Sequence, residues 1–316
     1  MLVERNDVRY KDGMGETMVS VRDFRKRYGN LEAVKGIGFE VARGEVFALL
    51  GPNGAGKTST LECLEGLRAP DGGELRVAGI DPSRHPRKLW DAIGVQLQAS
   101  ALPPSMTVDE AMGLFCRYHG KAPRPDLVDR MGLSRKRGEQ FARLSTGLQR
   151  RLSLALAVAH DPAVLFLDEP TAGLDVPSRA ELHALIGELR RAGTTVILAT
   201  HDMAEAEKLA DRAAILLAGS IAATGTPKQL TASGRQRTRI SVASERGLLL
   251  STDPGFPDAE RREASEGYVL YYSSNPASTV AAILTWLEKA GDPLADLRVE
   301  RPSLEERFLE ITGAKG

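Results

Sequence analysis

The chain has little cysteine and no excess charge of either sign, and each absence excludes a class of protein. Two cysteines in 316 residues, Cys63 and Cys116, are too few for a disulfide framework and too far apart for a cysteine-rich metal site. The 42 Lys and Arg residues balance 42 Asp and Glu residues, so no net field draws the chain to nucleic acid or to an anionic bilayer. We therefore expect two buried thiols in a reducing cytosol and no nucleic-acid partner.

Long apolar runs are also missing. Residues 1–7 are charged and lack the apolar core of a signal peptide. No uncharged apolar stretch approaches the roughly 20 residues that a spanning helix needs. The longest such stretches, residues 152–159 and 213–223, are short enough to be buried core elements. The sequence therefore predicts a chain that does not cross a membrane by itself.

Three short apolar runs are the clearest sign of the fold. Residues 46–50, 163–167 and 195–199 are continuously apolar, and polar residues follow each of them at once. Strands of this kind are usually buried on both faces of a parallel sheet. Ligands bind to such sheets beyond the carboxyl ends of the strands, where these polar residues lie. The pattern predicts an α/β core.

Changes in composition predict the domain organisation. Residues 1–16 indicate a loose leader, and residues 17–230 alternate between strand and helix patterns. Within this part, the pattern at about residues 100–150 predicts a helical insertion. It contains an amphipathic helix over residues 106–118, which ends before the prolines of 121–125. Residues 231–316 predict a small α+β domain with strands at 239–242, 268–272 and 297–300 and a helix at 277–290. Ser303-Leu-Glu-Glu306 has the form of a capping box that begins a last helix.

The strongest motif is Gly51-Pro-Asn-Gly-Ala-Gly-Lys-Thr58, which directly follows an apolar strand and precedes the helical run from Ser59 to Leu67. It fits the phosphate-binding P-loop, G-x-x-x-x-G-K-[ST]. Its glycines let backbone N–H groups turn inward around an anion, and the helix N-terminus adds partial positive charge. Lys57 then reaches the β- and γ-phosphates, and the Thr58 hydroxyl is a hard oxygen ligand for Mg²⁺. The predicted phosphate-binding residues are Gly51, Pro52, Asn53, Gly54, Ala55, Gly56, Lys57, Thr58 and Ser59.

The second and third apolar runs also end in residues that suit phosphate chemistry. Asp168-Glu169 follows the second run, which places Asp168 to hold Mg²⁺ and Glu169 to orient or deprotonate an attacking water. His201 follows the third run. A histidine at a strand end is more often structural, but here it could donate a hydrogen bond to the γ-phosphate. Gln98 is a second candidate after a strand, and Gln96 competes with it for any role.

The order of these motifs resembles the ATP-binding cassette (ABC) ATPases over about residues 17–230. The sequence has the P-loop, Gln98, Leu144-Ser-Thr-Gly-Leu148, Asp168-Glu169, Gly173-Leu-Asp175 and His201 in this order. The resemblance implies that Ser145 and Gly147 form a signature loop that binds the γ-phosphate of ATP held by an opposite subunit. It also implies that Asp175 is the D-loop aspartate and that Gln98 senses Mg²⁺ and a membrane partner.

Two further features follow from the resemblance. Tyr28 lies where the family has an aromatic side chain that stacks on adenine, although an ordinary half-buried tyrosine is the alternative. The signature loop departs from the common Leu-Ser-Gly-Gly-Gln pattern, because Thr146 replaces the first glycine and Leu148 replaces the glutamine. Loss of that amide predicts weaker ATP-driven dimer closure, and a site with little ATPase activity is the extreme case.

The last 86 residues extend the resemblance. Arg301-Pro-Ser-Leu-Glu-Glu-Arg-Phe-Leu-Glu-Ile-Thr-Gly313 is similar to the accessory domain of bacterial antibiotic-export ATPases of the daunorubicin-resistance type. This implies a bacterial ATPase subunit at the cytoplasmic face of the membrane, paired with a second copy of itself and a separate multi-spanning permease. Multidrug or antibiotic export driven by ATP and Mg²⁺ is the function it implies.

Two other functions fit parts of the sequence. A soluble ABC ATPase that acts on ribosomes or DNA is the main alternative, but the chain has neither a second cassette nor a long coiled-coil insertion. A P-loop kinase for small molecules would leave the motif at 145–147 and His201 without a role. Because shared cassettes serve several functions, the single cassette and the C-terminal segment carry the choice of a transporter subunit.

Overall fold

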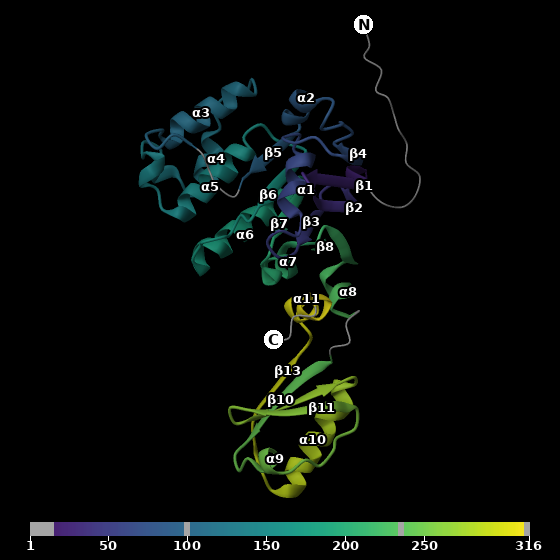
Figure 1. Ribbon diagram of the computed structural model, residues 1–316. Coiled ribbons are helices and arrows are strands. Elements are labelled where there is room, and N and C mark those ends of the chain that lie inside the picture. Colours follow the sequence, from purple (N-terminus) through teal and green to yellow (C-terminus); the bar gives the residue numbers. More distant parts are fainter. Residues whose placement is uncertain (1–15, 98–101, 233–236, 313–316) are drawn as a thin grey trace. The chain divides into compact units, whose positions relative to one another are not determined.

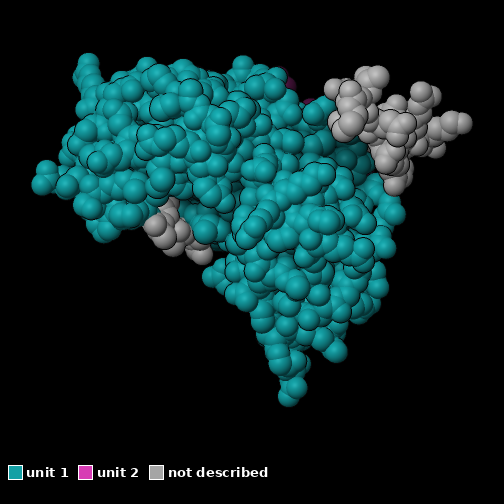
Figure 2. Space-filling model, turned by 90° about the horizontal axis from the view of Figure 1, so that it is seen from above, with its two compact units in different colours: residues 1–227 teal, residues 228–316 magenta. Residues whose placement is uncertain are grey.

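The computed structural model describes residues 16–97, 102–232 and 237–312 of the chain. The chain divides into two compact units, 1–227 and 228–316, drawn as ribbons in Figure 1. Figure 2 shows the surface of the first unit in teal. The change in sequence composition predicted this boundary at residue 230. In the described ranges, no helix has both the length and the apolar content that crossing a bilayer requires.

A six-stranded sheet forms the centre of the first unit. Its order is β5 (Ile93–Gln96), β6 (Val164–Asp168), β7 (Thr195–Thr200), β3 (Val46–Leu50), β8 (Arg212–Leu217) and β9 (Ser220–Gly225). The first five strands run parallel, and only β9 is antiparallel to its neighbour. The three apolar runs are β3, β6 and β7, and each residue of these strands is buried. The parallel α/β core expected from the sequence is confirmed.

One face of this sheet packs against a second sheet that the sequence analysis did not predict. This sheet has the order β2 (Leu31–Ala42), β1 (Thr17–Tyr28) and β4 (Gly72–Val77), and it is antiparallel. Its buried residues share one apolar cluster with helix α1 (Lys57–Leu64), where the rings of Phe39 and Phe47 stack with centroids 4.9 Å apart. Register shifts interrupt the pairing of β1 with both neighbours, so its apolar residues do not alternate regularly along the sequence.

Helices cover the other face of the central sheet. The helical insertion contains α3 (Val108–Tyr118) and α4 (Pro125–Arg130), and α5 (Thr146–Ala157) and α6 (Val176–Arg191) follow it. Their apolar residues form one cluster with those of β6 and β7. The helix expected from residue 106 begins at Val108, because a capping box formed by Thr107 and Glu110 fixes its start. Shorter helices α2 (Pro86–Trp90) and α7 (Met203–Leu209) complete the unit.

Both cysteines are buried and unbridged, as expected. Cys63 lies in α1, and its burial raises the pKa of the thiol to about 11. Cys116 lies in α3 within the apolar cluster of the helices. Both thiols are therefore shielded from solvent, and neither is placed for chemistry.

The second unit is a small α+β fold, as predicted. It contains β10 (Thr238–Ser244), α9 (Leu248–Ser251), β11 (Ala259–Ser265), β12 (Tyr268–Ser273), α10 (Pro276–Ala290), β13 (Leu294–Glu300) and α11 (Leu304–Thr312), after α8 (Pro227–Ala232). The antiparallel sheet has the order β11-β12-β10-β13. Strand β11 was missed because its sequence, Ala-Glu-Arg-Arg-Glu-Ala-Ser, is that of an exposed edge strand without apolar alternation. The capping box at Ser303 and Glu306 is present, with hydrogen bonds of 3.0 and 3.1 Å.

Candidate functional site

Three strands of the central sheet place the predicted functional residues at one edge of the sheet. The P-loop follows β3, β6 ends at Asp168, and His201 follows β7. A pocket of about 310 Å³ lies at this edge. Its lining residues are Tyr28, Leu31, Ala33, Pro52, Asn53, Gly54, Gly56, Lys57, Thr58, Ser59, Asp168, Glu169 and His201. Most of the P-loop prediction and all three strand-end residues therefore share one pocket.

The P-loop needs its glycines at two close approaches. A Cβ on Gly51 would lie 2.4 Å from the Leu216 carbonyl oxygen, and one on Gly56 would lie 2.8 Å from the Ala33 carbonyl oxygen. Gly56 also has a φ of 105°, which L-residues with side chains rarely adopt, at the residue directly before α1. Larger residues would push the loop away from the sheet, so glycine keeps its backbone N–H groups at the N-terminus of α1.

Lys57 is buried, and its side chain contacts the backbone of the P-loop. Its Nζ donates to the carbonyl oxygens of Gly51 at 2.6 Å and Pro52 at 3.2 Å. Burial lowers the pKa of the lysine, while the carboxylates of Glu169 and Asp168 act in the opposite direction. The ammonium group is thus fixed at the end of the pocket where phosphate oxygens would lie.

Oxygen ligands for a cation meet beside the lysine. The Thr58 hydroxyl donates to Asp168 Oδ2 at 3.3 Å. Burial raises the pKa of Asp168, and the Thr58 hydrogen bond partly opposes that rise. A hydroxyl and a carboxylate at this separation fit the hard oxygen ligands that Mg²⁺ prefers.

Glu169 contacts both Lys57 of the P-loop and His201. Its Oε2 lies 2.8 Å from Nδ1 of His201, and its Oε1 lies 3.9 Å from Nζ of Lys57. Its φ of 47° puts a non-glycine residue in the left-handed region, a strained conformation that often occurs at functional sites. The buried carboxylate therefore lies between the base of the P-loop and an exposed histidine.

Tyr28 enters the pocket from the end of β1. Its hydroxyl donates to Ser59 Oγ at 3.3 Å, and 38% of the residue is exposed. Leu31 and Ala33 follow on β2 and line the same pocket. Neither residue was predicted from the sequence, because an ordinary leucine and alanine carry no signal of a binding site apart from their place beside Tyr28 in the hairpin.

The signature residues lie elsewhere in the unit. Ser145 caps the N-terminus of α5, and its exposed side chain accepts from the Leu148 N–H at 3.4 Å. Asp175 caps α6 by accepting from the Ser178 N–H at 2.9 Å, and a Cβ on Gly147 would lie 2.9 Å from Ser178 Oγ. The N-termini of α5 and α6 therefore lie close together, but none of the three predicted residues here lines the nucleotide pocket.

The departures from the common signature pattern differ in their surroundings. Thr146 is exposed in the first turn of α5, whereas Leu148 packs against the apolar cluster of the helices. The leucine thus takes part in the core of this chain. Gln149 bonds the Phe141 carbonyl oxygen at 3.0 Å, so its amide is used within the chain.

Gln98 lies outside the described residues, so its predicted role stays a prediction. Its competitor, Gln96, is buried at the end of β5, and its amide has no hydrogen-bond partner in the described ranges. Arg150 of α5, which the sequence analysis did not single out, donates to the Leu97 carbonyl oxygen at 3.2 Å. This bond joins the signature helix to the chain directly before residue 98.

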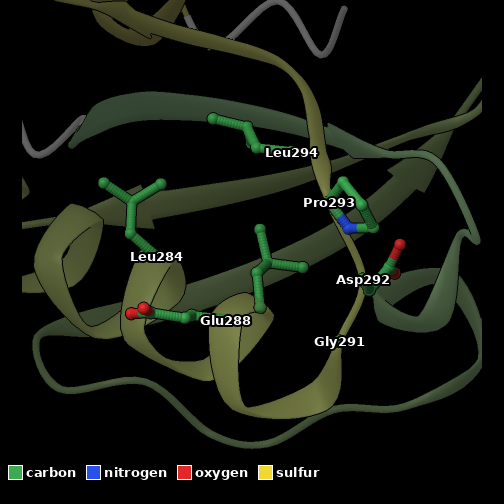
Figure 3. A pocket seen from close by; sticks show the side chains of 7 residues that line it. Leu284, Glu288, Gly291, Asp292, Pro293 and Leu294 are labelled. Atoms are coloured by element: carbon green, nitrogen blue, oxygen red, sulfur yellow. The ribbon is translucent and has the colours of Figure 1, made fainter.

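A second hollow, of about 380 Å³, lies in the C-terminal unit between α10 and the start of β13 (Figure 3). Leu284, Leu287, Pro293 and Leu294 supply most of its lining. Its buried carboxylate, Asp292, is occupied by Ser244 Oγ at 2.6 Å and by the N–H groups of Arg246 and Leu248. Glu288, whose carboxylate is exposed, is the other acidic residue of the lining, so the described residues of this hollow form no cluster of polar groups.

Comparisons with known proteins agree with this geometry. A family model described as ABC transporter matches residues 34–172. The chain is 37% identical to Nod factor export ATP-binding protein I of Ralstonia nicotianae, over 95% of this chain and 96% of that protein. It is 35% identical to Daunorubicin resistance ATP-binding protein DrrA3 of Streptomyces coeruleorubidus, over 95% and 97% of the two chains.

Two solved structures extend the comparison. The ATP-binding subunit of an ABC transporter is similar with a TM-score of 0.64 and 27% identity, over 68% of this chain and 92% of that chain. A dimeric ATP-binding cassette in a post-hydrolysis state with ADP and phosphate is similar with a TM-score of 0.62 and 25% identity, over 66% and 98%.

Proposed function

This chain belongs to the family of ABC transporter ATP-binding proteins, and on that premise we propose that it drives export through a separate membrane permease. It is an ATP-binding and ATP-hydrolysing subunit, as its family and its relatives establish. The proposal adds the role of each site residue, the need for a second copy, and the direction of transport.

The pocket supports a division of roles for hydrolysis. Lys57 and the P-loop N–H groups hold the β- and γ-phosphates, and Tyr28 stacks on the adenine. Two buried carboxylates line the pocket, and that of Asp168 accepts from the Thr58 hydroxyl. Glu169 therefore orients the attacking water and accepts its proton, because its carboxylate contacts His201 and has no such bond to Thr58. His201 positions that carboxylate through the 2.8 Å contact and can donate to the γ-phosphate from its exposed edge.

The same geometry fits a magnesium ion. Thr58 Oγ1 and Asp168 Oδ2 lie 3.3 Å apart and are the described groups that would hold it, with Gln98 as the further predicted ligand. When bound, Mg²⁺ neutralises charge on the phosphate oxygens.

The single observation that carries the two-copy proposal is where the signature residues lie. Ser145, Gly147 and Asp175 are outside the pocket formed by the P-loop, Asp168 and His201. Because family resemblance assigns them to the γ-phosphate, a second copy must bring them to it. Two chains then close around two ATP molecules, and closure excludes bulk water from the reaction. A complete motif set in each chain favours a homodimer.

Export through a permease at the cytoplasmic face of a bacterial membrane rests on the relatives. Their names refer to Nod factor export and to daunorubicin resistance, and the similarity covers 95% of this chain, including its C-terminal unit. We extend this to a drug, antibiotic or lipid-like substrate, bound by the permease.

A pull-down tests the proposal. Tagged Glu169→Gln chain would be loaded with Mg·ATP, captured from detergent-solubilised host membranes and analysed by mass spectrometry, with the Lys57→Ala chain as the matched control. We expect a multi-spanning protein in about equal amount, enriched over the control. Ribosomal proteins or DNA, with no membrane protein, would overturn export and support the soluble alternative.

A further inference from the structure

Two cations lie against the ring of Tyr28. Lys26 Nζ is 5.4 Å from the ring centroid, and Arg68 Cζ is 5.6 Å from it. Both distances are within the range in which a cation is attracted to an aromatic face. Lys26 comes from β1, two residues before the tyrosine, whereas Arg68 comes from the segment after α1.

Acidic partners fix both cations. Lys26 Nζ lies 2.8 Å from Asp71 Oδ2 and donates to the Ala69 carbonyl oxygen at 2.9 Å. Asp71 is itself held, because it accepts from the Arg27 N–H at 2.7 Å. Arg68 pairs with Glu62 at 2.5 Å. The cations are therefore parts of a bonded frame around the ring.

The frame lies outside the pocket that the ring lines. Tyr28 and Ser59 line the nucleotide pocket, and neither Lys26 nor Arg68 does. The Tyr28 hydroxyl bonds Ser59, and Arg68 bonds Glu62, so both connections lead to α1, the helix that follows the P-loop. One helix thus connects the base-binding ring to the phosphate-binding loop.

We propose that Lys26 and Arg68 are positioning residues that fix the Tyr28 ring for the purine base of ATP. The inference rests on the proposed role of Tyr28. A partly exposed tyrosine would lose side-chain freedom when a base stacks on it, and a ring that is already fixed loses less. The two cations therefore strengthen binding of the base and leave binding of the triphosphate unchanged.

The test measures separately how the base and the triphosphate contribute to the affinity for ATP. Dissociation constants for ATP and for inorganic tripolyphosphate would be measured on the full chain, its Lys26→Met/Arg68→Met variant, and a control in which the exposed Arg84 is replaced by Met. We expect ATP affinity of the double variant to fall about fivefold to tenfold, with tripolyphosphate affinity and the control unchanged. An equal loss for both ligands, or no loss for either, would overturn the proposal.

The same substitutions in a Tyr28→Ala background show whether the cations act through the ring. We expect no further loss of ATP affinity there, and an additive loss would contradict positioning. If Tyr28→Ala itself leaves ATP affinity unchanged, the adenine-stacking role fails. If Tyr28→Ala weakens ATP and the double variant does not, only the role of Lys26 and Arg68 fails.

Discussion

Helices α1 and α5 both begin at a sequence for which we propose phosphate binding, but their N-termini have opposite surroundings. The N-terminus of α1 lies inside a pocket, where Lys57 is buried and Glu169, Asp168 and His201 surround it. The N-terminus of α5 is exposed at Ser145 and Thr146, and neither residue lines that pocket. We call these two regions the P-loop half (residues 51–59 with Asp168, Glu169 and His201) and the signature half (residues 144–148 with Asp175).

These opposite surroundings indicate that ATP binding and ATP hydrolysis require different numbers of chains. The P-loop half has its partners within one chain, so a single chain has what it needs to bind ATP. The signature half offers a capped helix N-terminus to solvent, which suits an anion that arrives with another molecule. On the proposed roles, hydrolysis depends on a second copy, while binding does not.

The largest expected effect comes from the P-loop half. Replacing Glu169 by Gln removes the proton acceptor but keeps a similar shape, so turnover should fall about a thousandfold while the dissociation constant for ATP stays the same. Phosphate release and equilibrium ATP binding would be measured side by side. The matched control is Glu188→Gln, a surface glutamate of α6 that pairs with Arg130. Unchanged turnover in Glu169→Gln would remove this residue from the role of base.

A second prediction concerns a buried acid at the far end of α1. Burial, followed by the nearby Asp168 and Glu62 carboxylates, raises the pKa of Glu65 from 4.5 to about 8. The folded chain then keeps a proton that the unfolded chain releases near pH 4.5. The contribution of Glu65 to stability is therefore full below pH 4.5 and falls as the pH rises to about 8.

Glu65→Gln should remove this pH dependence. We expect the free energy of unfolding to rise on the order of 3 kcal/mol at pH 8 and to stay the same at pH 4. Urea unfolding at the two pH values measures both. A variant that is less stable than the parent at pH 8 would contradict a raised pKa of Glu65 in the folded chain.

Helix α5, which begins at the signature half, packs closely on the sheet at its other end. A Cβ on Gly94 of β5 would lie 2.0 Å from the Ala157 carbonyl oxygen at the end of α5. Gly94→Ala should therefore lower the free energy of unfolding by about 3 kcal/mol, near the upper end for overpacking. Gly187 of α6 has no atom within 4 Å of an added Cβ, so Gly187→Ala is the control and should raise stability by up to about 1 kcal/mol. Equal effects of the two substitutions would show that α5 does not pack closely on β5.

The sequence predicted the P-loop half more fully than the rest, for a physical reason. Residues 51–58, Asp168 and His201 each follow a short apolar strand, and parallel strands bring their carboxyl ends together. The antiparallel sheet containing β1 could not be predicted in the same way, because its register shifts break the apolar alternation. Leu31 and Ala33 line the pocket through that sheet, so they were missed with it. Strand β11 has charged residues on an exposed edge and gives no apolar pattern.

A complementation assay tests the division between the two halves most directly. Chains carrying Lys57→Ala and chains carrying Ser145→Arg would be assayed for ATP hydrolysis separately and as an equal mixture. In a mixed pair, one site combines an intact P-loop half from the Ser145→Arg chain with an intact signature half from the Lys57→Ala chain. We expect each variant alone to be nearly inactive and the mixture to regain activity. A mixture no more active than the two variants measured separately would contradict a site shared between two copies.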